Sequence, residues 1–158
     1  MRRAALLAAV AAALAAALAQ AAKPHVASVS MGEVPAVRAG AGATLKVAVT
    51  VKPGFHVQAN PVLNPALIPI VLAVPQTPAV SIGKPVYPQA RRLRLVGSEE
   101  DLVVYDGTFV IEQPVTVSQD SPRGETVLAG SLRYQACDDR HCLIPRTLPV
   151  ELRLRVVE

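Results

Sequence analysis

Alternation of apolar and polar residues is the feature that most restricts the fold of this chain. In the segment 150–157, Val150, Leu152, Leu154 and Val156 alternate with mostly charged residues, and the segment 45–50 repeats the same two-residue period. A period of two sends successive side chains to opposite faces, so both segments are predicted to be half-buried strands. The 14 prolines leave little room for helix, because proline removes a backbone donor and fixes φ.

Further β-rich runs are spread along the chain. The run 108–118 and the run that begins at Glu125 are separated by Asp120-Ser121-Pro122-Arg123-Gly124, a turn sequence. The second of these runs is predicted to continue to Cys137. Other candidate strands are 26–30, 55–59, 68–74 and 80–86. Seven or more short strands predict an all-β domain, a sandwich of two antiparallel sheets.

The N-terminal segment predicts export. Arg2 and Arg3 precede an Ala/Leu run from Ala4 to Ala19, and small residues offer cleavage after Ala19 or Ala21. We therefore expect a signal peptide over 1–21 and one domain over 22–158, with an uncleaved anchor as the alternative. The formal charge of +4 falls to +2 once the two arginines are removed. That charge is too small to indicate a nucleic-acid partner.

The two cysteines of the chain, Cys137 and Cys142, lie in the segment 134–145, which reads Y-Q-A-C-D-D-R-H-C-L-I-P. A disulfide between them would close a six-residue loop, worth roughly 2 kcal/mol on the chain-entropy estimate, against nearly 5 kcal/mol for a loop of about a hundred residues. A structural brace would gain more by joining distant strands. The spacing therefore favours a redox couple or a metal site.

The charged neighbours of the two sulfurs predict unequal reactivity. Arg140 and His141 precede Cys142 and would favour its thiolate, whereas Asp138 and Asp139 follow Cys137 and would disfavour its thiolate. We therefore expect Cys142 to be the more reactive sulfur.

Two other interpretations of the cysteine pair stay open. The disulfide could pin a turn and do nothing else. Alternatively, Cys137, Cys142, His141 and perhaps His56 could bind Cu(I) or Zn(II), although no second cysteine pair stands behind them. A lone histidine such as His56 on a strand is usually structural. No nucleophile-elbow serine and no phosphate-binding glycine loop is found, and five aromatic residues make no stacking platform, so we predict no cofactor.

Taken together, these motifs resemble the N-terminal periplasmic domain of DsbD-type thiol:disulfide interchange proteins. The motif Y-Q-A-C-D-D-x-x-C-L followed by proline carries most of the resemblance. Weaker matches follow in the family's order over about residues 24–157: Gly54-Phe55-His56-Val57, Ile68-Pro69, Tyr87-Pro88 and Val104-Tyr105-Asp106-Gly107.

The resemblance implies an immunoglobulin-like antiparallel β-sandwich whose cysteine pair relays electrons. Cys142 would form the mixed disulfide with partners and Cys137 would resolve it. The supporting residues would be the other members of the motif: Tyr134, Gln135, Asp138, Asp139, Arg140 and His141.

The family also covers its disulfide with a cap loop, which corresponds by order to 99–107, with Val104 and Tyr105 at the covering positions. Ile144 stands where members often carry a proline. The partners implied are periplasmic thioredoxin-fold proteins, of the disulfide isomerase or cytochrome c maturation type.

We therefore expect a periplasmic, monomeric thiol–disulfide exchange protein that lacks the family's membrane domain and draws electrons from a separate membrane donor. The alternative is a non-catalytic β-sandwich binding module with a structural hairpin disulfide.

Overall fold

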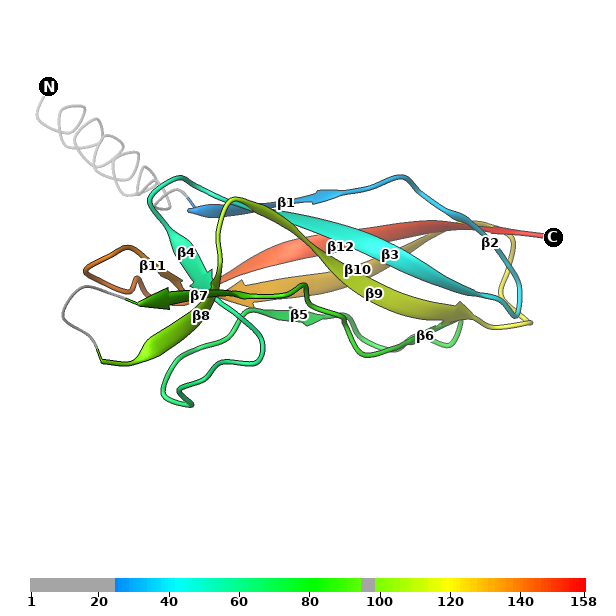
Figure 1. The fold of residues 1–158 in the computed structure, drawn as a ribbon. Helices are drawn as coiled ribbons and strands as arrows, with labels where there is room; N and C mark the ends of the chain where they lie inside the picture. The colour runs from blue at the N-terminus through cyan, green and yellow to red at the C-terminus, as the bar shows by residue number, and fades with distance from the viewer. Residues whose placement is uncertain (1–24, 95–98) are drawn as a thin grey trace, which may run out of the picture.

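The computed structural model describes residues 25–94 and 99–158, and within these ranges the chain forms strands and connections without a helix. Figure 1 shows an elongated body made of long strands, with a group of short strands at one end and the C-terminus at the other. The strands are β1 (Ala27–Met31), β2 (Ala36–Arg38), β3 (Gly42–Val51), β4 (His56–Gln58), β5 (Val71–Ala73), β6 (Val80–Ile82), β7 (Arg91–Arg94), β8 (Asp101–Tyr105), β9 (Thr108–Val117), β10 (Gly124–Tyr134), β11 (Ala136–Cys137) and β12 (Arg146–Val157).

These strands form a sandwich, which confirms the predicted all-β, immunoglobulin-like class. One layer has the order β1-β3-β9-β6 and the other has the order β2-β12-β10-β5. Two features differ from a sandwich of two antiparallel sheets. A third sheet has the order β11-β4-β8-β7, and the short strand β2 pairs with β12 in parallel.

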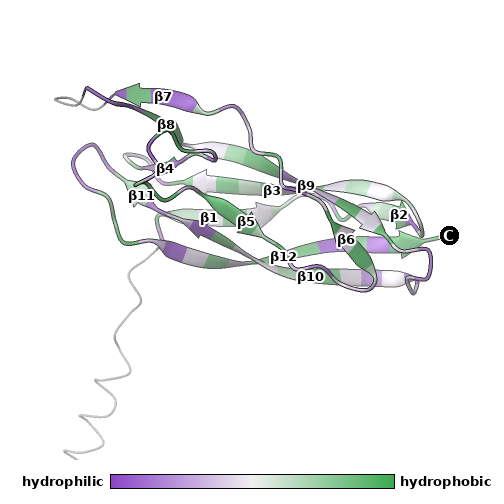
Figure 2. Ribbon diagram, turned by 90° about the horizontal axis from the view of Figure 1, so that it is seen from below, coloured by the Kyte–Doolittle hydropathy of each residue, from purple (hydrophilic) through white to green (hydrophobic). Residues whose placement is uncertain are grey.

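The core lies between the two long layers, and the alternation in the sequence decides which side chains enter it. Along β12 every second residue from Leu148 to Val156 is buried, and the residues between them face outward. The same alternation runs along β3, whose inward residues start at Leu45. Figure 2 shows this as alternating green and purple or white bands along the long strands. Burial of each large aliphatic side chain contributes about 1.5–3 kcal/mol to the stability of this arrangement.

The third sheet is assembled from continuations of both layers. Strand β3 continues into β4, and β8 leads into β9, at neighbouring turns that contain Gly54 and Gly107. Both glycines have positive φ, +83° and +59°, which other residues rarely adopt, and the Val51 amide donates a 2.8 Å hydrogen bond to the Gly107 carbonyl between the two turns. From the other layer, β10 leads into β11. The third sheet therefore caps one end of the sandwich.

The structure corrects two predicted boundaries and adds strands that the alternation does not predict. The run from Glu125 to Cys137 is not one strand, because the chain leaves its sheet at Gln135 and β11 pairs with β4 instead of β12. The segment 99–107 is not a loop throughout, since 101–105 forms β8. Strands β2 and β7 were not predicted at all, because neither shows an apolar alternation of useful length.

No helix within 25–94 or 99–158 is long and apolar enough to cross a membrane. The predicted signal peptide, 1–21, lies outside the described residues.

Candidate functional site

Cys137 and Cys142 form a disulfide that closes a tight turn, with 3.9 Å between their Cα atoms. Cys137 ends β11, and the two residues face each other as an isolated antiparallel bridge. The backbone closes the turn on both sides of the sulfurs: the Asp138 amide donates to the His141 carbonyl (3.0 Å) and the Leu143 amide donates to the Ala136 carbonyl (2.8 Å). The two cysteines therefore stand at the two ends of the short connection 138–141.

Asp138 stabilises this turn from within. Its Oδ1 accepts hydrogen bonds from the backbone amides of Arg140 (2.8 Å) and His141 (2.6 Å). These two amides lower the pKa of the Asp138 carboxyl, so the side chain is ionised over a wider pH range. The carboxylate serves the turn, and the His141 ring extends into solvent with its Nδ1 4.0 Å from Asp138 Oδ1.

Asp139, Arg140, His141 and Cys142 are all exposed residues. A disulfide sulfur does not titrate, so the predicted influence of these charges on thiolate formation stays a prediction.

The two cysteine residues differ sharply in burial. Cys137 is 2% exposed because it lies within the third sheet, where β4 covers one edge of β11. Cys142 lies on the returning segment and is exposed. A reactant from solvent therefore meets Cys142 first.

Two polar side chains of β4 lie on the same face of the sheet as Cys137. His56 is directly opposite Cys137 in the register, and Gln58, two residues further, donates a hydrogen bond from Nε2 to Cys137 Sγ at 3.6 Å. Both are buried, at 6% and 1% exposure. His56 Nε2 and Gln58 Oε1 have no hydrogen-bond partner among the described residues.

Burial lowers the pKa of His56, and the positive charge of Arg91 lowers it further, while Asp106 and Asp138 act in the opposite direction. The sequence left two interpretations of His56 open, a structural histidine or a candidate metal ligand. Gln58 was missed, although its position two residues after His56 was a usable signal, because residues i and i+2 share a face of a strand.

The predicted supporting residues Tyr134 and Gln135 hold the base of the turn. Tyr134 is buried at the end of β10, and its hydroxyl lies 3.3 Å from His25 Nδ1. Gln135 Nε2 donates a 3.1 Å hydrogen bond to the carbonyl of Leu143, one residue after Cys142. Gln135 thus connects the point where the chain changes sheets to the segment that carries the exposed sulfur.

Val104 and Tyr105, the predicted covering residues, lie in β8, on the other side of β4 from the disulfide. Val104 is fully buried opposite Gln58, and Tyr105 donates from its hydroxyl to the Pro88 carbonyl at 2.9 Å. Both residues belong to the strand that pairs with β4 on the edge opposite to β11. Their covering role for the sulfurs stays a prediction.

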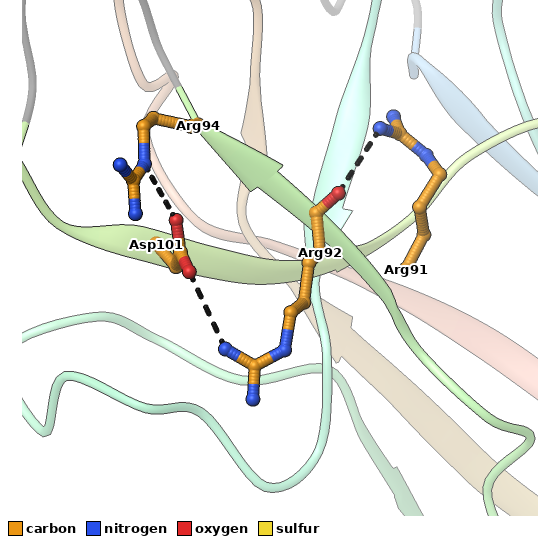
Figure 3. A network of polar contacts seen from close by, with 4 residues as sticks. All are labelled: Arg91, Arg92, Arg94 and Asp101. Carbon is orange, nitrogen blue, oxygen red and sulfur yellow. Dashed lines mark hydrogen bonds and ion pairs between the residues drawn. The ribbon is translucent and has the colours of Figure 1, made fainter.

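An arginine-rich edge strand closes the third sheet on the side away from the cysteines. Figure 3 shows Arg92 and Arg94 reaching the same carboxylate, that of Asp101, at 3.3 and 2.8 Å, and Arg91 pointing to the backbone carbonyl of Arg92. Arg91 also forms an ion pair with Asp106. The hydrogen bond from Arg94 lowers the pKa of Asp101. Charges on an edge strand hinder pairing with other chains.

A hollow of about 330 Å³ lies beside Cys142 and is bordered by Tyr134, Leu143, Ile144 and Arg146. Ile144 is 70% exposed and Leu143 is 39% exposed, so an apolar surface adjoins the accessible sulfur. Among the described residues no three His, Cys, Asp or Glu side chains are grouped as metal ligands. The arrangement can support thiol–disulfide exchange, with one accessible sulfur, one buried sulfur and polar groups beside the buried one.

Comparison with known proteins bears on the family. The N-terminal domain of the thiol:disulfide interchange protein DsbD, as a family model, matches residues 26–153. Among solved structures, the N-terminal periplasmic domain of ScsB from Proteus mirabilis is similar, with 16% identity and a TM-score of 0.49, over 82% of this chain and 44% of that chain. The chain thus spans less than half the length of that solved chain. The curated proteins contain no match.

The family match covers most of the chain and includes every strand from Ala27 to the middle of β12. Both cysteines lie inside it, and their disulfide fits thiol–disulfide exchange at the level of the family. The chain belongs to the family of DsbD N-terminal domains.

Proposed function

We propose that this protein is a periplasmic thiol–disulfide exchange protein that passes electrons through Cys137 and Cys142 to oxidised partners of the thioredoxin fold. The observation that carries the proposal is the unequal burial of the two bonded cysteine residues: Cys142 is exposed and Cys137 is 2% exposed. An exchange protein needs one sulfur that partners can reach and a second that reacts only within the protein. Membership of the DsbD N-terminal family supports the same chemistry.

The reaction proceeds in two balanced steps from the reduced protein. The Cys142 thiolate attacks the disulfide of the partner, forms a Cys142–partner disulfide, and releases the partner's first sulfur as a thiolate. The Cys137 thiolate then attacks Cys142 Sγ, which forms the Cys137–Cys142 disulfide and releases the partner's second sulfur with its electron pair. Two electrons and two protons have then passed to the partner. A dithiol donor restores the reduced state by the reverse exchange.

The proposed location rests on the N-terminal sequence. Arg2, Arg3 and the Ala/Leu run that follows are typical of a signal peptide, so we propose cleavage near Ala19–Ala21 and a mature domain over 22–158. An oxidising compartment is where a disulfide such as Cys137–Cys142 persists.

Trapping of the mixed disulfide tests the roles of the two sulfurs. In Cys137→Ser the resolving sulfur is absent, so a disulfide-bonded complex with an oxidised thioredoxin-fold isomerase accumulates on Cys142 and is seen by non-reducing electrophoresis. In Cys142→Ser the remaining sulfur is buried, and no complex is expected. Equal trapping by both variants, or transfer of electrons by Cys142→Ser, would contradict the assignment.

One observation favours a second function, that of a binding module with a structural disulfide: Cys137 ends β11, so its bond to Cys142 links the third sheet to the segment that follows the turn. The redox equilibrium with glutathione separates the two. Structural disulfides in secreted proteins lie below about −300 mV, whereas labile or catalytic ones lie higher. A value near −200 mV supports exchange, and a value well below −300 mV supports the binding module.

A further inference from the structure

The resolving step raises a problem that the burial of Cys137 makes acute. The attacking species is a thiolate, and burial in apolar surroundings disfavours a thiolate relative to a thiol. Cys137 is 2% exposed, so bulk water has little access to the proton that its thiol must lose. A group inside the protein has to receive that proton while the exchange proceeds.

Strand β4 holds the groups that lie next to this sulfur. His56 stands directly opposite Cys137 in an antiparallel pair, an arrangement that places Cβ atoms about 4.5–5.5 Å apart. Gln58 already contacts the sulfur, with its amide nitrogen 3.6 Å from Sγ. Gln58 lies 79 residues before Cys137 in the chain, and the third sheet brings the two together.

Both side chains have an unused polar atom. His56 is 6% exposed and Gln58 is 1% exposed, and neither His56 Nε2 nor Gln58 Oε1 has a hydrogen-bond partner among the described residues. An unpaired buried polar atom loses its hydrogen bonds to water without replacement, so two of them on residues beside Cys137 call for an explanation. The disulfide has no S–H to offer, whereas the reduced Cys137 has one. A thiol there would supply the missing donor.

The charges around His56 suit an imidazole that is neutral at rest and takes up a proton briefly. Burial and Arg91, from β7, disfavour the charged ring. Asp106, which follows β8, and Asp138, which follows β11, favour the charged ring. His56 also lines a second hollow, of about 500 Å³, which Lys52 and Asp139 border. The ring is therefore free of a proton near neutral pH, and two carboxylates stand close enough to support it once it is charged.

We propose that His56 accepts the thiol proton of Cys137 and that the Gln58 amide holds the resulting thiolate as it attacks Cys142. This assignment rests on the proposed exchange function and deepens it. The step is balanced: the S–H bond of Cys137 breaks, its proton goes to the His56 ring, and its electron pair forms the bond to Cys142 Sγ. The partner sulfur leaves with the electron pair of the old bond, and the His56 proton passes to solvent.

The aromatic disulfide dithiobis-nitrobenzoate allows the two steps to be watched separately in the full mature protein. Mixed with the reduced protein in a stopped-flow instrument, it releases one coloured thiolate when Cys142 attacks and a second when Cys137 resolves the mixed disulfide. In the wild type, the rate of the second release should be nearly independent of pH between about pH 7 and 8.5, because a neutral base takes the proton.

In His56→Gln the second release should slow about a hundredfold or more at neutral pH, as expected for loss of a general base, and the first release should be unchanged. The rate of the second release should then rise about tenfold per pH unit, since thiolate must form by ordinary ionisation, so that alkaline buffer restores it. Gln58→Leu should slow the second release by roughly tenfold, through loss of a hydrogen bond to a charged sulfur. Lys46→Gln, an exposed side chain on β3 outside the third sheet, is the control and should leave both releases unchanged.

A second release that keeps the wild-type rate and flat pH profile in His56→Gln would overturn this inference and leave the exchange function standing. Absence of a second release in the wild type would instead contradict the exchange function. Should His56→Gln fail to fold, the wild-type profile decides by itself, because a tenfold rise per pH unit from about pH 7 would exclude a neutral base.

Discussion

Reduction of the Cys137–Cys142 disulfide should lower the free energy of unfolding by only about 2 kcal/mol. The two cysteines are five positions apart, so the bond closes a loop of six residues, and on the chain-entropy estimate such a loop restricts the unfolded chain by roughly 2 kcal/mol. In the folded protein the backbone hydrogen bonds from Asp138 to His141 and from Leu143 to Ala136 hold the turn without help from the sulfurs. The fold should therefore survive reduction.

The same free energy must appear in the redox equilibrium, because folding and oxidation form a closed thermodynamic cycle. If oxidation stabilises the folded protein by about 2 kcal/mol, the folded pair must be oxidised more readily than the unfolded pair by the same amount. For a two-electron couple, this corresponds to a potential lower by about 45 mV in the folded protein. Two independent measurements on one unaltered chain should thus agree.

Urea unfolding of the oxidised protein, and of the protein kept reduced with excess dithiol, gives the first quantity. Glutathione equilibria in buffer and in concentrated urea, with thiols trapped and counted by mass, give the second. Cys137→Ala/Cys142→Ala should resemble the reduced protein in stability and serves as the control for incomplete reduction. A stability loss of 4 kcal/mol or more, or a reduced protein that unfolds in buffer, would refute the reasoning and identify the disulfide as a brace for the third sheet.

Three further predictions concern other parts of the molecule. The pKa of His56 lies below its usual 6.5, so the unfolded chain binds the proton more readily than the folded protein does. The free energy of unfolding should therefore fall as pH decreases below about 6.5. Urea titrations at several pH values should show this slope in the wild type and its loss in His56→Gln. Gly130→Ala should lower the free energy of unfolding in urea by about 1–3 kcal/mol, since a Cβ there would lie 2.8 Å from a backbone carbonyl oxygen of β5. Gly32→Ala, where the nearest atom would be 3.8 Å from the new Cβ, should change it by only about a few tenths of a kcal/mol. Equal losses in the two variants would contradict the argument. Ile144→Ser should reduce kcat/KM for a thioredoxin-fold partner severalfold without changing the redox potential, and Val127→Ser, exposed on β10 about 24 Å from Tyr134, should change neither; a similar loss from both would remove Ile144 from the contact surface.

The long strands could be predicted from the sequence because alternation is a local property. Leu152 and Leu154 are fully buried and their charged neighbours are exposed, as a period of two requires. Strand β7 could not be predicted in this way, because Arg91-Arg92-Leu93-Arg94 contains one apolar residue. It is ordered by pairing with β8 and by carboxylates that approach its arginines from the same sheet.

The surroundings of Cys137 depend on topology, which alternation does not reveal. Nothing near Gln58 in the sequence indicates a sulfur, and the contact exists because β10 leaves its layer at Gln135 and continues as β11 beside β4. The same change of sheet was hidden in the sequence, since residues up to Cys137 continue an unbroken β-like run. Family resemblance implied the roles of the two cysteines, but it did not show which polar groups lie next to them.

The change of sheet also gives a physical basis for the proposed division of labour between the sulfurs. The charges of Arg140 and His141 predicted that Cys142 is the more reactive sulfur, and in the structure both are exposed residues of the turn. Burial points in the same direction for a different reason: Cys137 is covered because it is the last residue of β11, and Cys142 is accessible because it returns along the outer side of that strand. If burial decides the roles, substitutions that replace Arg140 and His141 by uncharged residues should alter the rate of the first exchange step. They should not change which of the two sulfurs the partner binds. A partner trapped on the sulfur at 137 after those substitutions would show that charge, and not position in the third sheet, decides.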